Sequence, residues 1–299
     1  MGLTEQLAFQ GLNGLTWGLI LALMALGLSL IYGVLRIINV AHGALYTVGA
    51  VLAWALTPLV GFSAALALAA FGVGLLGALL ELAVLRPVEE KPVLTIIITF
   101  GLLLVLEHLI LLSLGGAPRA LPLPRALQFS IPLFGLRYPG YRVVVAGLAL
   151  LASGGLWLVL HRTRLGLQVR AIAQSRELAR ALGLPVRKVY ALTFGLGAAL
   201  AGLAGALTAP LISVSYRMGE PVLVTAFIVV IVGGLGSLGG ALLASIAFGL
   251  LTGLFAIWTT PTLAQVLALA ALGLPLLFCP EGLIPRSRSR SRGLVPTGS

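Results

Sequence analysis

Five long stretches of this chain carry no charged side chain. Asp, Glu, Lys and Arg are all missing from residues 6–35, 37–80, 143–161, 189–216 and 221–280. A helix needs about 20 apolar residues to cross a bilayer, so several of these stretches can hold more than one crossing. Charged residues make up only 9% of the chain, far below the share in soluble globular proteins. We expect an all-α, polytopic integral membrane protein.

About eight or nine transmembrane helices fit the apolar pattern. We expect them near 9–35, 41–58, 62–85, 93–114, 143–160, 189–209, 223–238, 241–257 and 262–279. The segment at 223–238 is short for a full span, so a re-entrant segment is the competing interpretation. Residues 1–285 are then one transmembrane domain, and residues 286–299 look partly like a cloning or protease-site remnant.

The charged loops predict the orientation. Seven basic residues and one acid lie in the loop 162–188, whereas four arginines and five prolines lie in the loop 115–142. One crossing separates these loops, and the richer one should be cytosolic. The N-terminus then faces outward, and the basic excess reflects membrane topology, with no nucleic-acid partner expected. Glu5 and the length of the first apolar run argue against a cleavable signal peptide.

Several functional classes are disfavoured by what the chain lacks. One cysteine (Cys279), three histidines and no Asp offer no convincing metal set or catalytic triad, so an enzyme is not expected. No phosphate-binding G-x-x-x-x-G-K-[ST] motif is present, so ATP would have to bind to another chain. There is no selectivity-filter signature or ring of charges of the kind found in ion channels.

Polar residues interrupt one apolar run. Asn39 and His42 precede Gly43, and such groups cost free energy in hydrocarbon unless they face a neighbour or a cavity. A glycine run at Gly233–Gly240 forms a second break, and paired breaks can mark internal symmetry around a translocation path. The alternative is that these residues serve helix packing alone. The candidate path residues are Asn39, His42, Gly43, Gly233, Gly234 and Gly236.

Three ionisable groups lie at or near membrane depth. Glu81 is about one helical turn from Arg86, which favours a structural ion pair near the cytosolic face. Glu107 is deeper and can either bond an arginine or a hydroxyl or be neutral, with a proton relay as the less favoured alternative. The adjacent His108 points to a different face of its helix.

The cytosolic loop predicts a short amphipathic helix over 167–182 that ends at Gly183. Composition leaves two roles open for it, lying at the headgroups or docking a soluble partner. The loop resembles the coupling loop of ABC-import permeases, in particular the branched-chain amino acid permease family of the LivH type, through Arg170-Ala171, Ala173, Ala179 and Gly183. Further blocks resemble the same family, namely SLIYGVLRIINVAHG (29–43), ALTFGLGAALAGLAGAL (191–207), GGLGSLGGALLASIAFG (233–249) and PEGLI (280–284).

The resemblance implies a permease subunit of the bacterial cytoplasmic membrane that carries leucine, isoleucine or valine. It implies a second homologous permease, two cytosolic subunits that bind ATP and Mg, and an external solute-binding protein. The implied ATPase-coupling residues are Arg170, Ala173, Arg176, Glu177, Ala179 and Gly183. Ser175, Thr225 and Glu107 depart from the usual family residues.

Two alternatives to this function stay open. Within the same class, the substrate could be urea, a short amide or another amino acid. From another class, a stand-alone proton- or sodium-driven transporter is disfavoured because deep carboxylates are rare and Asp is missing.

Overall fold

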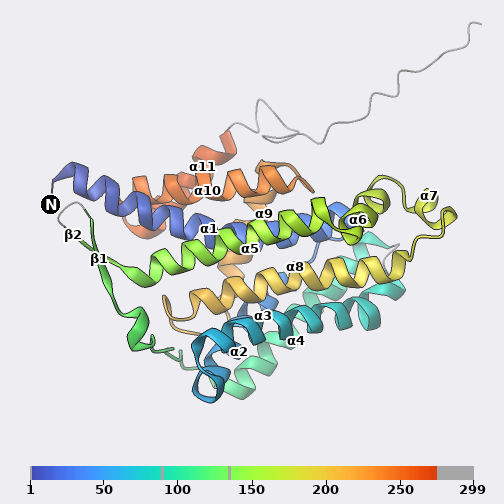
Figure 1. The fold of residues 1–299 in the computed structure, drawn as a ribbon, viewed down its shortest axis with the longest axis horizontal. Coiled ribbons are helices and arrows are strands. Elements are labelled where there is room, and N and C mark those ends of the chain that lie inside the picture. Colours follow the sequence, from blue (N-terminus) through green and yellow to red (C-terminus); the bar gives the residue numbers. More distant parts are fainter. Residues whose placement is uncertain (1, 89–90, 134–135, 275–299) are drawn as a thin grey trace, which may run out of the picture.

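The computed structural model describes residues 2–88, 91–133 and 136–274, and these form a long helical bundle (Figure 1). The expected all-α, polytopic class is confirmed. Its helices are α1 (Leu3–Leu35), α2 (His42–Val60), α3 (Phe62–Leu80), α4 (Pro92–Leu114), α5 (Gly140–Arg162), α6 (Arg164–Gln174), α7 (Arg176–Ala181), α8 (Val186–Thr208), α9 (Gly219–Gly233), α10 (Leu238–Phe255) and α11 (Pro261–Gly273).

Short elements complete the described chain. A π turn (Glu81–Leu85) and a 3-10 turn (Arg86–Val88) extend α3, and a second 3-10 turn covers Arg125–Leu127. Strands β1 (Ser130–Leu133) and β2 (Leu136–Pro139) pair antiparallel, with Ser130 opposite Pro139. Among the described residues, seven helices are long and apolar enough to cross a membrane, while α9 and α11 are shorter. Cys279 and the PEGLI segment lie outside the described residues.

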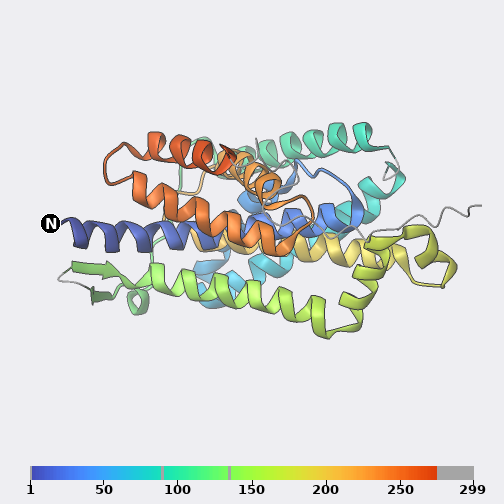
Figure 2. The same cartoon turned by 90° about the horizontal axis from the view of Figure 1, so that it is seen from above.

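The two ends of the bundle differ in character. The N-terminus and the β hairpin lie at one end, and α6 and α7 lie at the other (Figures 1 and 2). Because the basic loop 162–188 belongs to the α6–α7 end, the positive-inside rule predicts that this end is cytosolic and that the hairpin end is external. The most buried spans are α1 and α8, which form the centre of the bundle.

Helix α2 begins inside the bundle, well away from its cytosolic end. The chain leaves α1 at Arg36, whose φ of 59° puts it in the left-handed region, and residues 36–41 run back toward the interior. His42 then lies against Gly27, and Gly27 crosses α8 at Gly197, the middle of that helix. The first turn of α2 is therefore at the depth of the middle of α8.

Helix α9 also begins in the interior, and its start meets the start of α2. A Cβ added at Gly43 would lie 3.0 Å from the Gly219 carbonyl oxygen, and one added at Gly219 would overlap the Gly43 carbonyl oxygen. Only glycine permits this approach of two backbones. The segment before α9, residues 209–218, is non-helical like the segment before α2.

The contacts follow an inverted repeat. Helix α1 packs on α10 as α8 packs on α3, and α2 packs on α8 as α9 packs on α1. The two central helices touch reciprocally through Gly27 and Gly197, and the two interrupted helices through Gly43 and Gly219. These pairs relate α1–α4 to α8–α11 with opposite directions through the membrane, an arrangement known from transporters with inverted-topology repeats.

The predicted pairing of the two helix breaks is wrong. We expected the Asn39–Gly43 break to correspond to the run Gly233–Gly240, but its counterpart is the segment 209–218 before α9. The glycine run instead makes the tight turn between α9 and α10, where Gly234 and Gly236 have φ of 99° and 80°. A glycine run marks close backbone approach, which a turn needs as much as a broken helix does.

Replacing Gly219 with alanine should destabilise the protein through this contact. The added methyl overlaps the Gly43 carbonyl, and overpacking of this kind costs about 1–3 kcal/mol. The matched control is Gly147→Ala in α5, where no atom lies within 4 Å of an added Cβ. Unfolding in mixed detergent or bicelles measures both variants, and equal stability of the two would contradict the contact.

Candidate functional site

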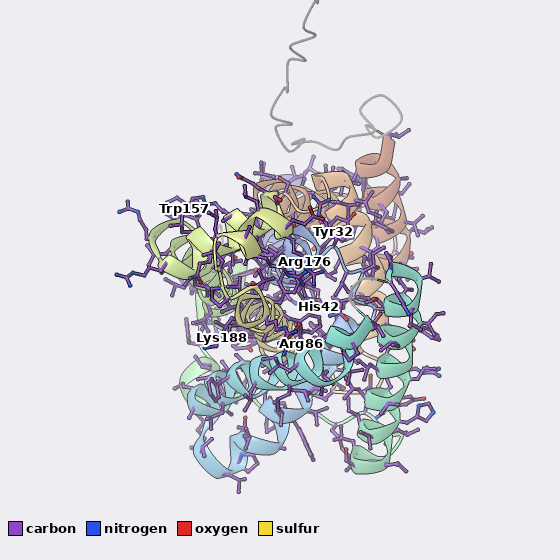
Figure 3. All side chains as sticks on the ribbon, turned by 90° about the vertical axis from the view of Figure 1, so that its right-hand side faces the viewer. Tyr32, His42, Arg86, Trp157, Arg176 and Lys188 are labelled. Carbon is purple, nitrogen blue, oxygen red and sulfur yellow. The ribbon has the colours of Figure 1, made fainter. Side chains whose placement is uncertain are left out.

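A buried polar group occupies the start of α2. Asn39 and His42 have exposed fractions of 1% and 0%. The His42 Nε2 lies 3.3 Å from the Met24 carbonyl oxygen, whereas its Nδ1 and both polar atoms of the Asn39 amide have no hydrogen-bond partner among the described residues. Figure 3 looks along the bundle from the α6–α7 end and has His42 in the interior.

Thr47 joins the two interrupted helices at this depth. Its hydroxyl accepts a hydrogen bond from the Gly219 N–H at 3.1 Å and donates one to the Gly43 carbonyl at 3.2 Å. The carbonyl and N–H groups that the interruption frees are thus partly satisfied within the protein, as hydrocarbon requires. The unpartnered atoms of Asn39 and His42 can still form hydrogen bonds with a ligand at mid-bundle depth.

The other predicted path residues lie at a different depth. Gly233, Gly234 and Gly236 belong to the α9–α10 turn, and Gly236 lies against Gly33 of α1. Gly33 is six residues beyond Gly27, or about 9 Å along the helix. The structure therefore brings Asn39, His42 and Gly43 together and leaves the three glycines of the turn nearer the cytosolic end.

The cytosolic loop forms two helices where one was predicted. The expected helix over 167–182 is divided into α6 and α7 by Ser175, which is extended (φ −151°, ψ 112°). The Ser175 hydroxyl accepts the Leu178 N–H at 3.2 Å and so caps α7. Serine is a favoured N-cap residue, and this local preference outweighs the continuous apolar pattern that predicted a single helix.

Arginines attach these two helices to the membrane spans. Arg170 of α6 donates a hydrogen bond to the Leu160 carbonyl near the end of α5. The Arg176 guanidinium at the start of α7 lies 5.4 Å from the centre of the Tyr190 ring on α8. Thr163 caps α6 by accepting the Gly166 N–H at 3.2 Å. These contacts join α6 to α5 and α7 to α8.

Gly183 closes α7 in a left-handed conformation with φ of 74°. The Gly183 N–H donates to the Arg180 carbonyl and the Leu184 N–H donates to the Ala179 carbonyl, both at 3.0 Å. This pair of bonds is the Schellman motif that ends many helices. Ala179 is buried under the turn, while Ala173 is half-buried on α6 and Glu177 is exposed in the first turn of α7.

Buried and exposed faces of α6 and α7 are separate. Val169, Ile172 and Ala179 are buried against the bundle, whereas Leu167, Leu178 and Leu182 are between 60% and 72% exposed. The sequence predicted an amphipathic helix here and left open whether it lies at the headgroups or docks a soluble partner. The three exposed leucines leave an apolar strip beside arginines at the cytosolic end, here called the leucine strip.

The acidic residues form the predicted pair with Arg86 and a second cluster around Glu107. The Arg86 Nη2 lies 3.5 Å from the Glu81 Oε2, which confirms the predicted pair. Glu107 of α4 is buried and interacts with Glu220 and Arg217 at the start of α9, and Arg217 Nε lies 3.7 Å from Glu220 Oε1. His108 is exposed on another face of α4, as expected.

Two residues of the mid-bundle junction were missed by the sequence reasoning. Thr47 and Gly219 carry the contact between α2 and α9. The order Gly219-Glu220-Pro221 was an available signal, because an acid and a proline in the first turn are typical of helix starts. That start lies four residues before the expected segment 223–238.

Comparisons with known proteins agree with the fold. A family model described as branched-chain amino acid transport system, permease component, matches residues 11–279. The high-affinity branched-chain amino acid transport system permease proteins BraD of Pseudomonas aeruginosa and LivH of Escherichia coli K12 are each 30% identical, over 93% of this chain and 95% of theirs. A probable branched-chain amino acid permease protein LivH of Methanocaldococcus jannaschii is 28% identical over 99% of this chain and 97% of its own. No solved structure matches with comparable significance.

Substituting Gly183 should loosen α7 selectively. Alanine at φ of 74° costs about 1–2 kcal/mol, so the amides of α7 should exchange hydrogen about 5- to 30-fold faster in Gly183→Ala. Asparagine tolerates the left-handed region better, so Gly183→Asn should exchange at an intermediate rate. Hydrogen exchange with mass spectrometry measures this, and unchanged protection in Gly183→Ala would refute the role of the turn.

Proposed function

Because the chain belongs to the family of branched-chain amino acid transport permeases, we propose that it is the membrane subunit through which an ATP-driven importer moves leucine, isoleucine and valine into the cytosol. The observation that carries the proposal is the leucine strip on α6 and α7, held to two membrane spans at the cytosolic end. The chain acts in transport and contributes no catalytic groups of its own.

The proposed assembly has partners on both sides of the membrane. ATP and Mg bind to two cytosolic subunits, a second homologous permease completes the path, and an external solute-binding protein delivers the substrate. The chain has no phosphate-binding loop motif in its sequence, which supports an energy source on another chain. The mostly exposed residues 115–132 offer a surface for the delivering protein.

Docking of an ATP-binding subunit would use the leucine strip. Covering these exposed leucines with a partner removes apolar surface from water, which stabilises the complex. The exposed Arg180 and Glu177 of α7 supply charge around that contact, which favours orientation of the partner. Together with Arg170, Ala173, Arg176, Ala179 and Gly183, these residues form the proposed coupling element.

Closure of the ATP-binding subunits would move this element and the spans attached to it. Arg170 holds α6 to α5, and Arg176 holds α7 to α8. Helix α8 packs on α1, α2 and α3, so its displacement would reach the start of α2. Alternating access would follow from a shift of these packed helices, since packed cores move between discrete arrangements.

The proposed path uses the polar atoms without hydrogen-bond partners at the start of α2. Asn39, His42 and Gly43 would meet the ammonium and carboxylate of the substrate, and the freed backbone near Gly233, Gly234 and Gly236 would meet it further along. An aliphatic side chain suits the apolar surroundings. Urea, a short amide or another amino acid is the alternative cargo for the same path.

Substitution of Leu178 tests the docking surface. Burying a leucine contributes about 1.5–3 kcal/mol, so Leu178→Ser should lower recovery of ATP-binding subunits in affinity purification from native membranes by at least about tenfold. The control is Leu3→Ser, since Leu3 is 58% exposed and Leu178 60% exposed, at opposite ends of the bundle. Failure of any ATP-binding subunit to co-purify with the wild type would favour a stand-alone ion-coupled transporter instead.

Alanine at Asn39 or His42 tests the path. Loss of one hydrogen bond to a charged group costs about 1.5–3 kcal/mol, so kcat/KM for leucine uptake should fall roughly 10- to 100-fold in either variant. His108→Ala is the matched control, because His108 is exposed on α4. Normal uptake by well-folded Asn39→Ala and His42→Ala variants would remove both residues from the path.

A further inference from the structure

A cavity of about 530 Å³ lies in the outer half of the bundle, apart from Asn39 and His42. It is walled by α1, α9, α10 and α11, together with Arg142 of α5, Tyr46 of α2, and Ile212 and Met218 of the segment before α9. Along α1 it extends from Gln10 to Leu21, about 16 Å of helix. Small-molecule sites commonly measure about 300–1,000 Å³, so the cavity has the size of a ligand site.

The cavity contains one charged side chain, Arg142, which has no counter-ion among the described residues. Arg142 donates a hydrogen bond to the Asn13 side-chain oxygen, and Asn13 in turn donates to Gln10 at 3.2 Å. No acidic residue lines the cavity, and within the described ranges no carboxylate pairs with Arg142. A half-buried guanidinium beside apolar walls is stabilised by an anion, and its planar fork matches a carboxylate.

Acceptors for a cation lie in the same cavity. The hydroxyls of Thr225 and Thr252 both donate back along their own helices, to the carbonyls of Pro221 at 2.9 Å and Phe248 at 2.8 Å. Their oxygen lone pairs therefore remain to accept hydrogen bonds. The amide of Gln265 on α11 supplies a further acceptor. These neutral acceptors suit an ammonium group that already carries its own carboxylate.

Apart from the Tyr46 phenol, the remaining wall is apolar. Trp17, Ile20 and Phe248 supply aromatic and aliphatic surface for a branched side chain. The start of α9 does not compete for the carboxylate, because its donors are already used. The Gly219 N–H bonds Thr47, the Glu220 N–H bonds the Arg217 carbonyl, and Pro221 has no N–H. Arg142 is therefore the one cationic donor that the described lining offers to an anion.

We propose that this cavity is a receiving site within one subunit for an α-amino acid with an aliphatic side chain. The carboxylate lies on Arg142, the ammonium lies among the acceptors of Thr225, Thr252 and Gln265, and the side chain lies against Trp17 and Phe248. The inference rests on the proposed function, because it assigns the same substrate a binding site on the external side, before the polar group at the start of α2.

Direct binding tests the site in the intact transporter. The complete complex, held in nanodiscs of neutral phosphatidylcholine without solute-binding protein or ATP, is titrated with radiolabelled leucine. Saturable binding is expected, with affinity about 10- to 100-fold weaker in Arg142→Gln, as for loss of a charged hydrogen-bonding partner. Arg142→Lys should retain part of the affinity. The control is Arg125→Gln, since Arg125 is exposed and outside the cavity.

Two further measurements separate recognition from misfolding. Val222→Trp fills the cavity without removing a charge, and it should abolish leucine binding while the ATP-binding subunits still co-purify. Leucinamide, which lacks the carboxylate, should compete far less well than leucine in the wild type. That difference between the two ligands should disappear in Arg142→Gln.

The opposing outcomes are distinct. Unchanged leucine affinity in Arg142→Gln and Val222→Trp, with ATP-driven leucine uptake intact, would overturn the receiving site and leave the proposed function standing. A phospholipid that co-purifies with the wild type, is lost from Arg142→Gln and is not displaced by leucine would also overturn it, as a lipid site. If the wild type shows neither leucine binding nor ATP-driven leucine uptake, the proposed function and the receiving site are both overturned.

Discussion

The contact between Gly43 and Gly219 is the constraint on which the rest of the architecture depends. A helix that starts inside a membrane frees backbone groups that hydrocarbon cannot satisfy. Here two such starts lie against each other, and the hydroxyl of Thr47 bonds to both. Any side chain at either glycine would separate the backbones. The two interruptions therefore stabilise one another.

The inverted repeat explains how this junction is held and how it could be moved. Glycine contacts bring α1 against α10 and α8 against α3, so each half packs against the central helix of the other. Helix α8 continues to the cytosolic end, where Arg176 of α7 lies over Tyr190. One rigid helix thus connects the leucine strip to the level of Gly197, where His42 and Gly27 meet.

Much of the fold could be predicted because apolar length and charge placement are local signals. Each expected span overlaps a helix in the described residues, and the arginines of 162–188 predict the orientation. The buried polar position of His42 was also predictable, since histidine in an apolar run needs a protein environment. Family resemblance supplied the coupling role, which charge and length alone had left open between docking and lying at the headgroups.

The rest depends on contacts between distant segments. The break at 209–218 carries one charge, Arg217 near its end, and that charge does not reveal a broken helix. Its meeting with α2 is what distinguishes it from an ordinary loop after a span. Ser175 divided the predicted cytosolic helix through a cap whose geometry composition does not reveal. Arg142 was assigned to an external loop, although α5 begins at Gly140, directly after Pro139. Its place in a cavity follows from the packing of α1, α5 and α9 to α11.

The most direct test of the account is a cryo-electron microscopy structure of the complete transporter in a lipid nanodisc, whose density locates the bilayer. The account predicts that α2 and α9 both begin within the hydrocarbon layer, with Gly43 and Gly219 in backbone contact and Thr47 between them. An α2 that runs unbroken from the cytosolic surface, or starts of α2 and α9 that lie apart near opposite surfaces, would contradict it.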